Sequence, residues 1–183
     1  MNSNNKKNLK DIILGGQDGL VNVLGIILGV AVATNNYVIV LIAGLSATWA
    51  ESISMGAVAY TSAKAARDYY KSVKKRVVKE YEQPLKSGFV VFLSAFIGSI
   101  IPLIPFSLIH AGVGLTVNTA LIYATLISLI TLFITGALKA KWSIGSWKKA
   151  GTEMALIGLG AVIAGYIVGV ILEYYFGVGL PKG

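Results

Sequence analysis

The stretch IILGGQDGLVNVLGIILGVAVA, residues 12–33, decides the fold class of this chain. It exceeds the roughly 20 mostly apolar residues that a helix needs to cross a bilayer. Four further stretches of similar length and character follow it. The sequence therefore predicts an all-α integral membrane protein with five transmembrane helices. These predicted helices cover residues of about 12–33, 38–63, 88–109, 115–138 and 151–176.

The composition excludes most soluble classes of protein. Of the 183 residues, 55% are hydrophobic and 13% are charged, about half the charged fraction of a soluble domain. Five spans leave no room for a second soluble domain, so we predict that residues 1–183 form a single transmembrane domain. The chain has no cysteine and one histidine, which excludes a disulfide framework and disfavours a zinc site of the usual kind. We predict no prosthetic group.

The positions of the basic residues predict the orientation in the membrane. Lys and Arg number three in the N-terminal segment, eight in the segment 64–87, four in the segment 139–150 and one in the C-terminal tail. The other two loops have none. Because cytoplasmic loops carry the excess of Lys and Arg, we expect the N-terminus in the cytoplasm and the C-terminus outside. The net charge of +8 then reflects topology and contact with lipid headgroups, not binding to nucleic acid.

The short basic cytoplasmic segment 64–87 is the largest polar stretch between the predicted spans. Its apolar residues recur with roughly helical spacing, so we expect the second helix to continue into it. We expect Pro84 to stop that helix, since proline cannot continue one.

Charged side chains at membrane depth mark candidate functional positions, because they are costly unless paired or hydrated. Asp18 and Glu51 lie inside the first and second predicted spans, and Asn22 and Met55 follow them by one turn on the same faces. These are adjacent antiparallel helices, so the four side chains can converge. Asp11, by contrast, is placed at a membrane edge and outside this site.

Oxygen ligands together with a thioether suit Fe²⁺ or Mn²⁺ better than Mg²⁺. The carboxylates can also carry protons when no metal is bound. The predicted metal ligands are Asp18, Asn22, Glu51 and Met55, with weaker contributions from Glu80 and Glu82 in the cytoplasmic segment.

Small residues and prolines predict features of helix packing. Glycines spaced four apart let helix backbones approach closely, and they predict a seam for a homodimer along the first helix. They are Gly15 with Gly19, Gly25 with Gly29, and Gly165 with Gly169 on the fifth helix. Pro102 and Pro105 should kink or break the third helix.

Three tracts give the chain a resemblance to a known family. They are GGQDGLVNVLGIILGVAVA (residues 15–33), AGLSATWAESISMGAVAYTSAKAARDYY (residues 43–70) and WKKAGTEMALIGLGAVIAGYIVG (residues 147–169). The first two resemble the first and second helices of the vacuolar iron transporter (VIT) family, and the third resembles its last helix. The resemblance implies five spans, a homodimer, and export of Fe²⁺ or Mn²⁺ from the cytosol in exchange for protons.

The resemblance also implies roles for individual residues. Asp18 and Met55 match the proposed metal contacts of the family. Many members have a glutamate two turns before that methionine, where this chain has Ala47, and we expect Glu51 to substitute for it. Many members also insert a longer acidic helical domain between the second and third helices. The segment here is short and mostly basic, which predicts that this metal-binding domain is absent.

Two other functions remain open from the residues. A non-transporting assembly or interaction subunit would pair its membrane acids with groups of another chain. An intramembrane enzyme would need a nucleophile and a base, and Ser54 beside Glu51 on one helix is poorly placed for that. We therefore predict a transporter and no enzyme. Because the chain is short, we expect a prokaryotic cell membrane, or a vacuolar membrane if the source is eukaryotic.

Overall fold

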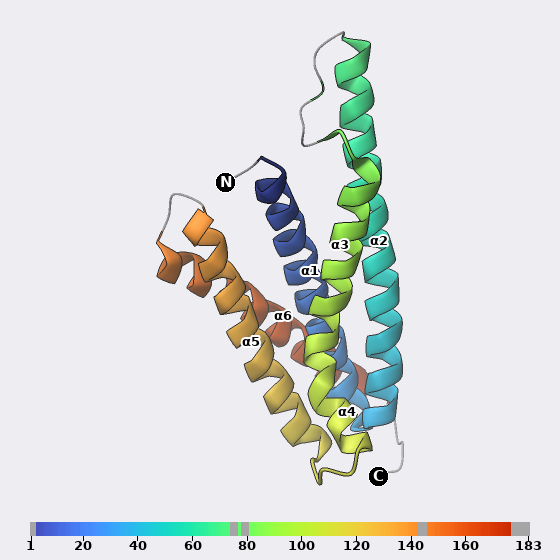
Figure 1. The fold of residues 1–183 in the computed structure, drawn as a ribbon. Coiled ribbons are helices and arrows are strands. Elements are labelled where there is room, and N and C mark those ends of the chain that lie inside the picture. Colours follow the sequence, from blue (N-terminus) through green and yellow to red (C-terminus); the bar gives the residue numbers. More distant parts are fainter. Residues whose placement is uncertain (1–2, 74–76, 78–80, 143–145, 177–183) are drawn as a thin grey trace. The chain divides into compact units, whose positions relative to one another are not determined.

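The protein is built from helices. A computed structural model describes residues 3–73, 77, 81–142 and 146–176, and helices are the only regular secondary structure in these residues. Their bounds are α1 Ser3–Thr34, α2 Tyr37–Ser72, α3 Pro84–Ile100, the 3₁₀ turn η2 Ile101–Leu103, α4 Ile104–His110, α5 Val117–Trp142 and α6 Trp147–Phe176 (Figure 1).

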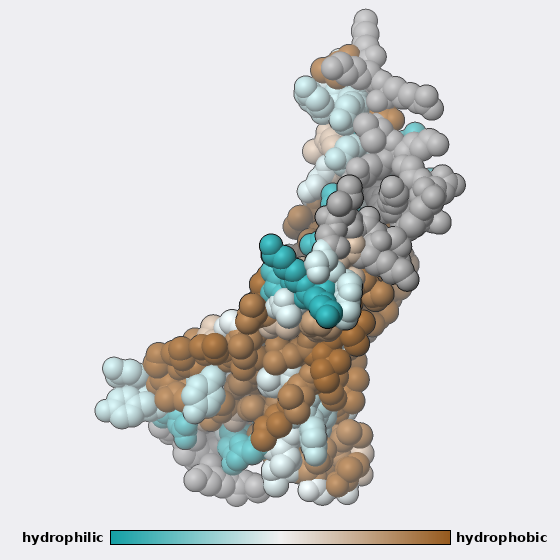
Figure 2. All heavy atoms as spheres, turned by 90° about the vertical axis from the view of Figure 1, so that its left-hand side faces the viewer, coloured by the Kyte–Doolittle hydropathy of each residue, from teal (hydrophilic) through white to brown (hydrophobic). Residues whose placement is uncertain are grey.

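Within the residues that the structure describes, five helical segments are long and apolar enough to cross a membrane, which confirms the predicted fold class. They are Leu9–Thr34, Tyr37–Ser72, Pro84–His110, Val117–Ala140 and Trp147–Tyr175. Many large apolar side chains on them are exposed, among them Leu156 at 65% and Phe89 at 65%. Figure 2 shows such side chains over much of one face. A surface of this kind faces lipid, where helices satisfy their own backbone groups.

Two asparagines turn the chain from α1 into α2. Asn35 has a φ of 46°, a left-handed conformation that asparagine adopts more easily than most residues. The side-chain oxygen of Asn36 accepts hydrogen bonds from the backbone N–H of Val38 at 2.9 Å and of Ile39 at 3.3 Å. Asn36 is therefore the N-cap of α2.

Prolines act differently at the two ends of the third span. Pro102 and Pro105 are buried where α3 gives way to η2 and α4, which confirms the predicted break. Each lacks the N–H that would continue the helix ladder. The prediction for Pro84 was wrong, because α2 already ends at Ser72 and Pro84 is the first residue of α3. Proline is well suited to that first position, where the missing N–H has no partner in the helix.

The chain divides into two compact units. The first unit comprises residues 1–19 and 49–98, and the second comprises residues 20–48 and 99–183. In the first unit, glycines bring backbones together. A Cβ at Gly88 of α3 would lie 2.8 Å from the carbonyl oxygen of Gly56 on α2. A Cβ at Gly15 of α1 would meet Val91 and Ser94 of α3.

The second unit has an apolar core. Its buried members are Val23, Ile27, Ala31, Val40, Leu103, Phe106, Ala120 and Ala124. In the same unit, Gly25 and Gly29 of α1 meet Ala161 and Gly165 of α6. These glycines therefore serve packing within one chain, and they leave the homodimer as a prediction without support from this seam.

Candidate metal site

Two of the predicted metal ligands lie on one side of α2. Glu51 and Met55 are four residues apart, so they share a face, and both are half-buried. Ser52 and Gly56 beside them are buried, and Gly56 packs against Gly88 of α3. The carboxylate and the thioether therefore border the seam between α2 and α3 in the first unit.

Met55 lines a cavity of about 310 Å³ in the first unit. The other walls come from α1, from the rest of α2, and from residues at and before the start of α3. They are Lys10, Asp11, Leu14, Val58, Ala59, Ser62, Ala63, Ala66, Tyr81, Ser87 and Val91. One thioether, two serine hydroxyls, a phenol and one carboxylate thus surround the same space.

Asp11 is the carboxylate of this cavity, and sequence reasoning had placed it outside the site. Its residue is only 9% exposed. Ser87 Oγ donates a hydrogen bond to its Oδ2 at 2.7 Å, and Ser94 Oγ donates to its backbone oxygen at 3.4 Å. The spacing of seven residues between Asp11 and Asp18 is two helical turns, and that periodicity is the signal that could have joined them.

Asp18 and Glu51 do not line this cavity, but each lies one turn beyond a residue that does. Asp18 follows Leu14 by four residues on α1, and Glu51 precedes Met55 by four residues on α2. The two helices run in opposite directions (Figure 1). Both residues are half-buried. Because the helices are antiparallel, both lie beyond the same end of the cavity.

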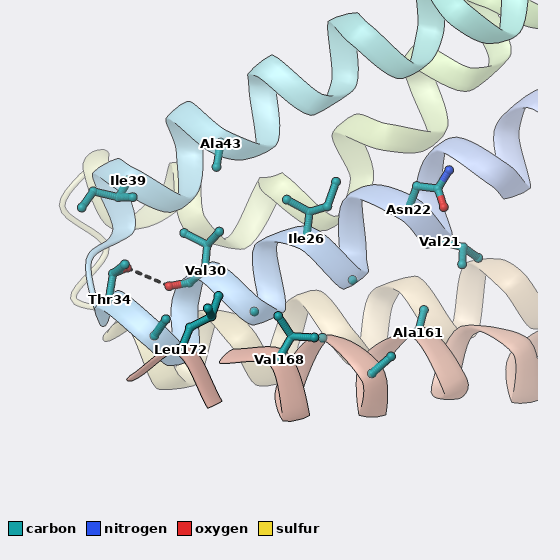
Figure 3. A pocket seen from close by; sticks show the side chains of 15 residues that line it. Val21, Asn22, Ile26, Val30, Thr34, Ile39, Ala43, Ala161, Val168 and Leu172 are labelled. Atoms are coloured by element: carbon teal, nitrogen blue, oxygen red, sulfur yellow. Dashed lines mark hydrogen bonds between the residues drawn. The ribbon is translucent and has the colours of Figure 1, made fainter. Parts of the chain in front are cut away.

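Asn22 belongs to the second unit and is exposed. It lines an apolar cavity of about 750 Å³ between α1, the start of α2, and α6. Figure 3 shows the labelled side chains of this cavity, with the hydroxyl of Thr34 donating to the backbone oxygen of Val30 at 2.8 Å. Its lining holds no carboxylate.

The remaining predicted ligands lie in the connection between α2 and α3. Glu82 is exposed, and Glu80 lies outside the described residues. Within the part of the chain that the structure describes, no three His, Cys, Asp or Glu side chains form a group that could hold a metal ion. A metal site in this part would use a mixed set of ligands such as carboxylate, hydroxyl and thioether.

Comparison with known proteins identifies the family. The chain is 26% identical to the vacuolar iron transporter of Plasmodium falciparum (isolate 3D7), over 92% of this chain and 83% of that protein. It is 25% identical to the vacuolar iron transporter of Toxoplasma gondii (strain ATCC 50861 / VEG), over 94% and 76%. It is 24% identical to vacuolar iron transporter 1 of Arabidopsis thaliana, over 91% and 86%. The model of the VIT family matches residues 9–83 and 76–170. The chain therefore belongs to the VIT family.

Proposed function

We propose that this protein is a membrane transporter that exports Fe²⁺, Mn²⁺ or both from the cytosol in exchange for protons. Membership of the VIT family carries the proposal. It is supported by the similarity to proteins named vacuolar iron transporters, which extends over most of the chain. The five apolar spans support it, because they supply a membrane domain that is long enough to hold a transport path.

Asp18, Glu51 and Met55 are the proposed transport ligands. Leu14 and Met55 line one cavity from two antiparallel helices, and the next turn of each helix carries Asp18 or Glu51. This register supports their convergence at membrane depth. Asn22, one turn further along α1, is the proposed supporting oxygen. Two carboxylates with a thioether favour Fe²⁺ or Mn²⁺ over Mg²⁺, which prefers oxygen ligands alone.

Proton exchange follows from the cost of charge in a bilayer. A carboxylate at membrane depth is costly unless another group or ion neutralises it. When the metal ion leaves Asp18 or Glu51, a proton can take its place and restore neutrality. The return of that carboxylate to the cytosolic side then releases the proton and completes one exchange cycle.

The proposed direction and location rest on the charge pattern. The basic segments 64–87 and 139–150 favour the cytoplasmic side, which places the N-terminus in the cytoplasm and the C-terminus outside. We propose a prokaryotic cell membrane, a single transmembrane domain over residues 1–183, and a homodimer as the working unit. Glu80 and Glu82 are the proposed weak ligands on the cytoplasmic side.

The test is Fe²⁺ and Mn²⁺ flux into proteoliposomes under an imposed pH gradient. We expect gradient-driven flux from the wild type, its loss in Asp18→Ala, and a strong reduction in Glu51→Gln. Glu173→Gln is the matched control, because Glu173 is an exposed carboxyl near the end of α6. An Asp18→Ala variant that transports normally would refute the site. Folded, dimeric wild type without flux would favour a non-transporting assembly subunit.

A further inference from the structure

The cavity of about 310 Å³ in the first unit has the features of a separate cation-binding site. Asp11 is nine-tenths buried against it. Ser87 Oγ donates a hydrogen bond to Oδ2 of this carboxylate at 2.7 Å. A carboxylate buried beside open space is costly unless a cation or a proton neutralises it.

The other polar groups of the lining suit a metal ion that keeps its water. The hydroxyls of Ser62 and Ser87 and the phenol of Tyr81 can accept hydrogen bonds from bound water, and Met55 closes the end nearest Glu51. Tyr81 is stacked on Tyr70 of α2 with ring centroids 6.1 Å apart, which holds the phenol ring in place. These groups are too few to replace a full coordination shell.

The size of the cavity agrees with this chemistry. Six waters occupy about 180 Å³ at about 30 Å³ each, and the cavity holds about 310 Å³. A divalent ion therefore fits with its first water shell in place. Such an ion need not lose water to be held there, so binding is weak and release is quick.

Lys10 lines the same cavity and is exposed. Long basic side chains extend their charged end toward water while the stem covers apolar surface. The positive charge of Lys10 repels a metal ion in the cavity and so lowers the affinity of the cavity for that ion. A weak site is what a capture step requires, because an ion held tightly would not move on.

We propose that this cavity captures a hydrated divalent metal ion, with Asp11 as the carboxylate that pairs with it through its water shell, and passes it to Asp18 and Glu51 one turn deeper. Only the second step, the transfer of the ion to Asp18 and Glu51, rests on the proposed transport function. The alignment with the Plasmodium relative spans 227 residues, more than the 183 of this chain, so that relative has residues that this chain lacks. The family match consists of two segments, residues 9–83 and 76–170, which overlap within the α2–α3 connection.

The test measures Mn²⁺ binding to the full chain by electron paramagnetic resonance, in which the signal of free Mn²⁺ falls as the ion binds. The background is the Asp18→Asn/Glu51→Gln double variant, which lacks the carboxylates of the proposed transport site. We expect this background to keep Mn²⁺ binding. Adding Asp11→Asn should weaken that binding at least about tenfold, since even groups behind a ligand cost about 10–100-fold. The asparagine keeps an oxygen for Ser87, so the contact between α1 and α3 is retained.

Two further variants separate the site from general effects of charge. Asp68→Asn removes an exposed acid that pairs with Arg67 at 3.4 Å outside the cavity, and it should leave binding unchanged. Lys10→Gln should strengthen binding several-fold, because it removes a positive charge from the site. In liposomes, Asp11→Asn alone should raise KM with little change in kcat, as expected for a group that holds the ion before transport.

The outcomes distinguish this inference from the proposed function. A background variant without Mn²⁺ binding, or an Asp11→Asn variant that binds as tightly as its background, overturns the inference. Wild-type liposomes without flux overturn the proposed function alone, because the binding experiment does not depend on transport.

Discussion

Gly98→Ala is the substitution whose effect the structure defines best. Gly98 on α3 faces the backbone of Gly16 on α1, within the first unit. A Cβ at this position would overlap the carbonyl oxygen of Gly16 and lie 2.9 Å from its carbonyl carbon. Its Cα would be 3.0 Å away. All three are backbone atoms, so no side chain can rotate to make room and the two helices must separate.

Two opposing effects set the magnitude. Alanine is favoured over glycine inside a helix by about 1 kcal/mol. Overpacking of a close contact costs about 1–3 kcal/mol, and rigid backbone on both sides places this case at the upper end. We therefore expect Gly98→Ala to lower the free energy of unfolding by about 1–2 kcal/mol. Gly160 of α6 is the matched control, because a Cβ there meets nothing within 4 Å. Gly160→Ala should be neutral or stabilise by up to about 1 kcal/mol.

The assay is unfolding by sodium dodecyl sulfate in mixed micelles, followed by circular dichroism, for the wild type and both variants. Flux in liposomes is the second readout. Asp18 lies two residues from Gly16, so a displaced α1 should reduce transport in Gly98→Ala and leave Gly160→Ala active. Equal stability of the two variants would show that the α1–α3 approach is not as close as the structure has it, and the reasoning would fail.

Two further predictions concern the second unit. Asn36→Ala removes the side-chain acceptor for Val38 and Ile39 N–H and should cost about 1 kcal/mol in the same unfolding assay, whereas Asn36→Asp should be close to the wild type. Ser128→Ala should be neutral or stabilise by up to about 1 kcal/mol, because the buried Ser128 hydroxyl has no hydrogen-bond partner among the described residues and alanine removes that unsatisfied group; a loss of more than 1 kcal/mol would mean that the hydroxyl has a partner.

The local sequence was sufficient to predict the structure where a residue type has a single structural effect in its position. Pro102 and Pro105 lie inside an apolar run, and the helix breaks there. Pro84 lies at the edge of a run, where proline suits either the residue after a helix or the first residue of the next. The sequence pattern does not distinguish these two positions, and the structure places Pro84 at the start of α3.

Asp11 shows the limit of reasoning from the chain alone. At a span edge, a carboxylate is ordinarily solvated. Its burial depends on Ser87 and Ser94 of α3, which are 76 and 83 residues away in the chain. The spacing of seven residues places Asp11 on the same face of α1 as Asp18, but it does not tell that Asp11 is buried. The glycine steps show the same limit, because a small face permits close approach without naming the partner helix; for Gly25 and Gly29 the partner is α6.

The sequence by itself determined the five spans, the segregation of basic residues and the positions of Asp18, Glu51 and Met55. The bilayer imposes these features one helix at a time, through length, charge and the cost of a buried carboxylate. Only the tertiary structure decided that Met55 shares a cavity with Asp11, and that α6 covers Gly25 and Gly29 of α1. Those facts depend on which helix faces meet, and helix packing in a membrane is selected by shape and by small residues from distant parts of the chain.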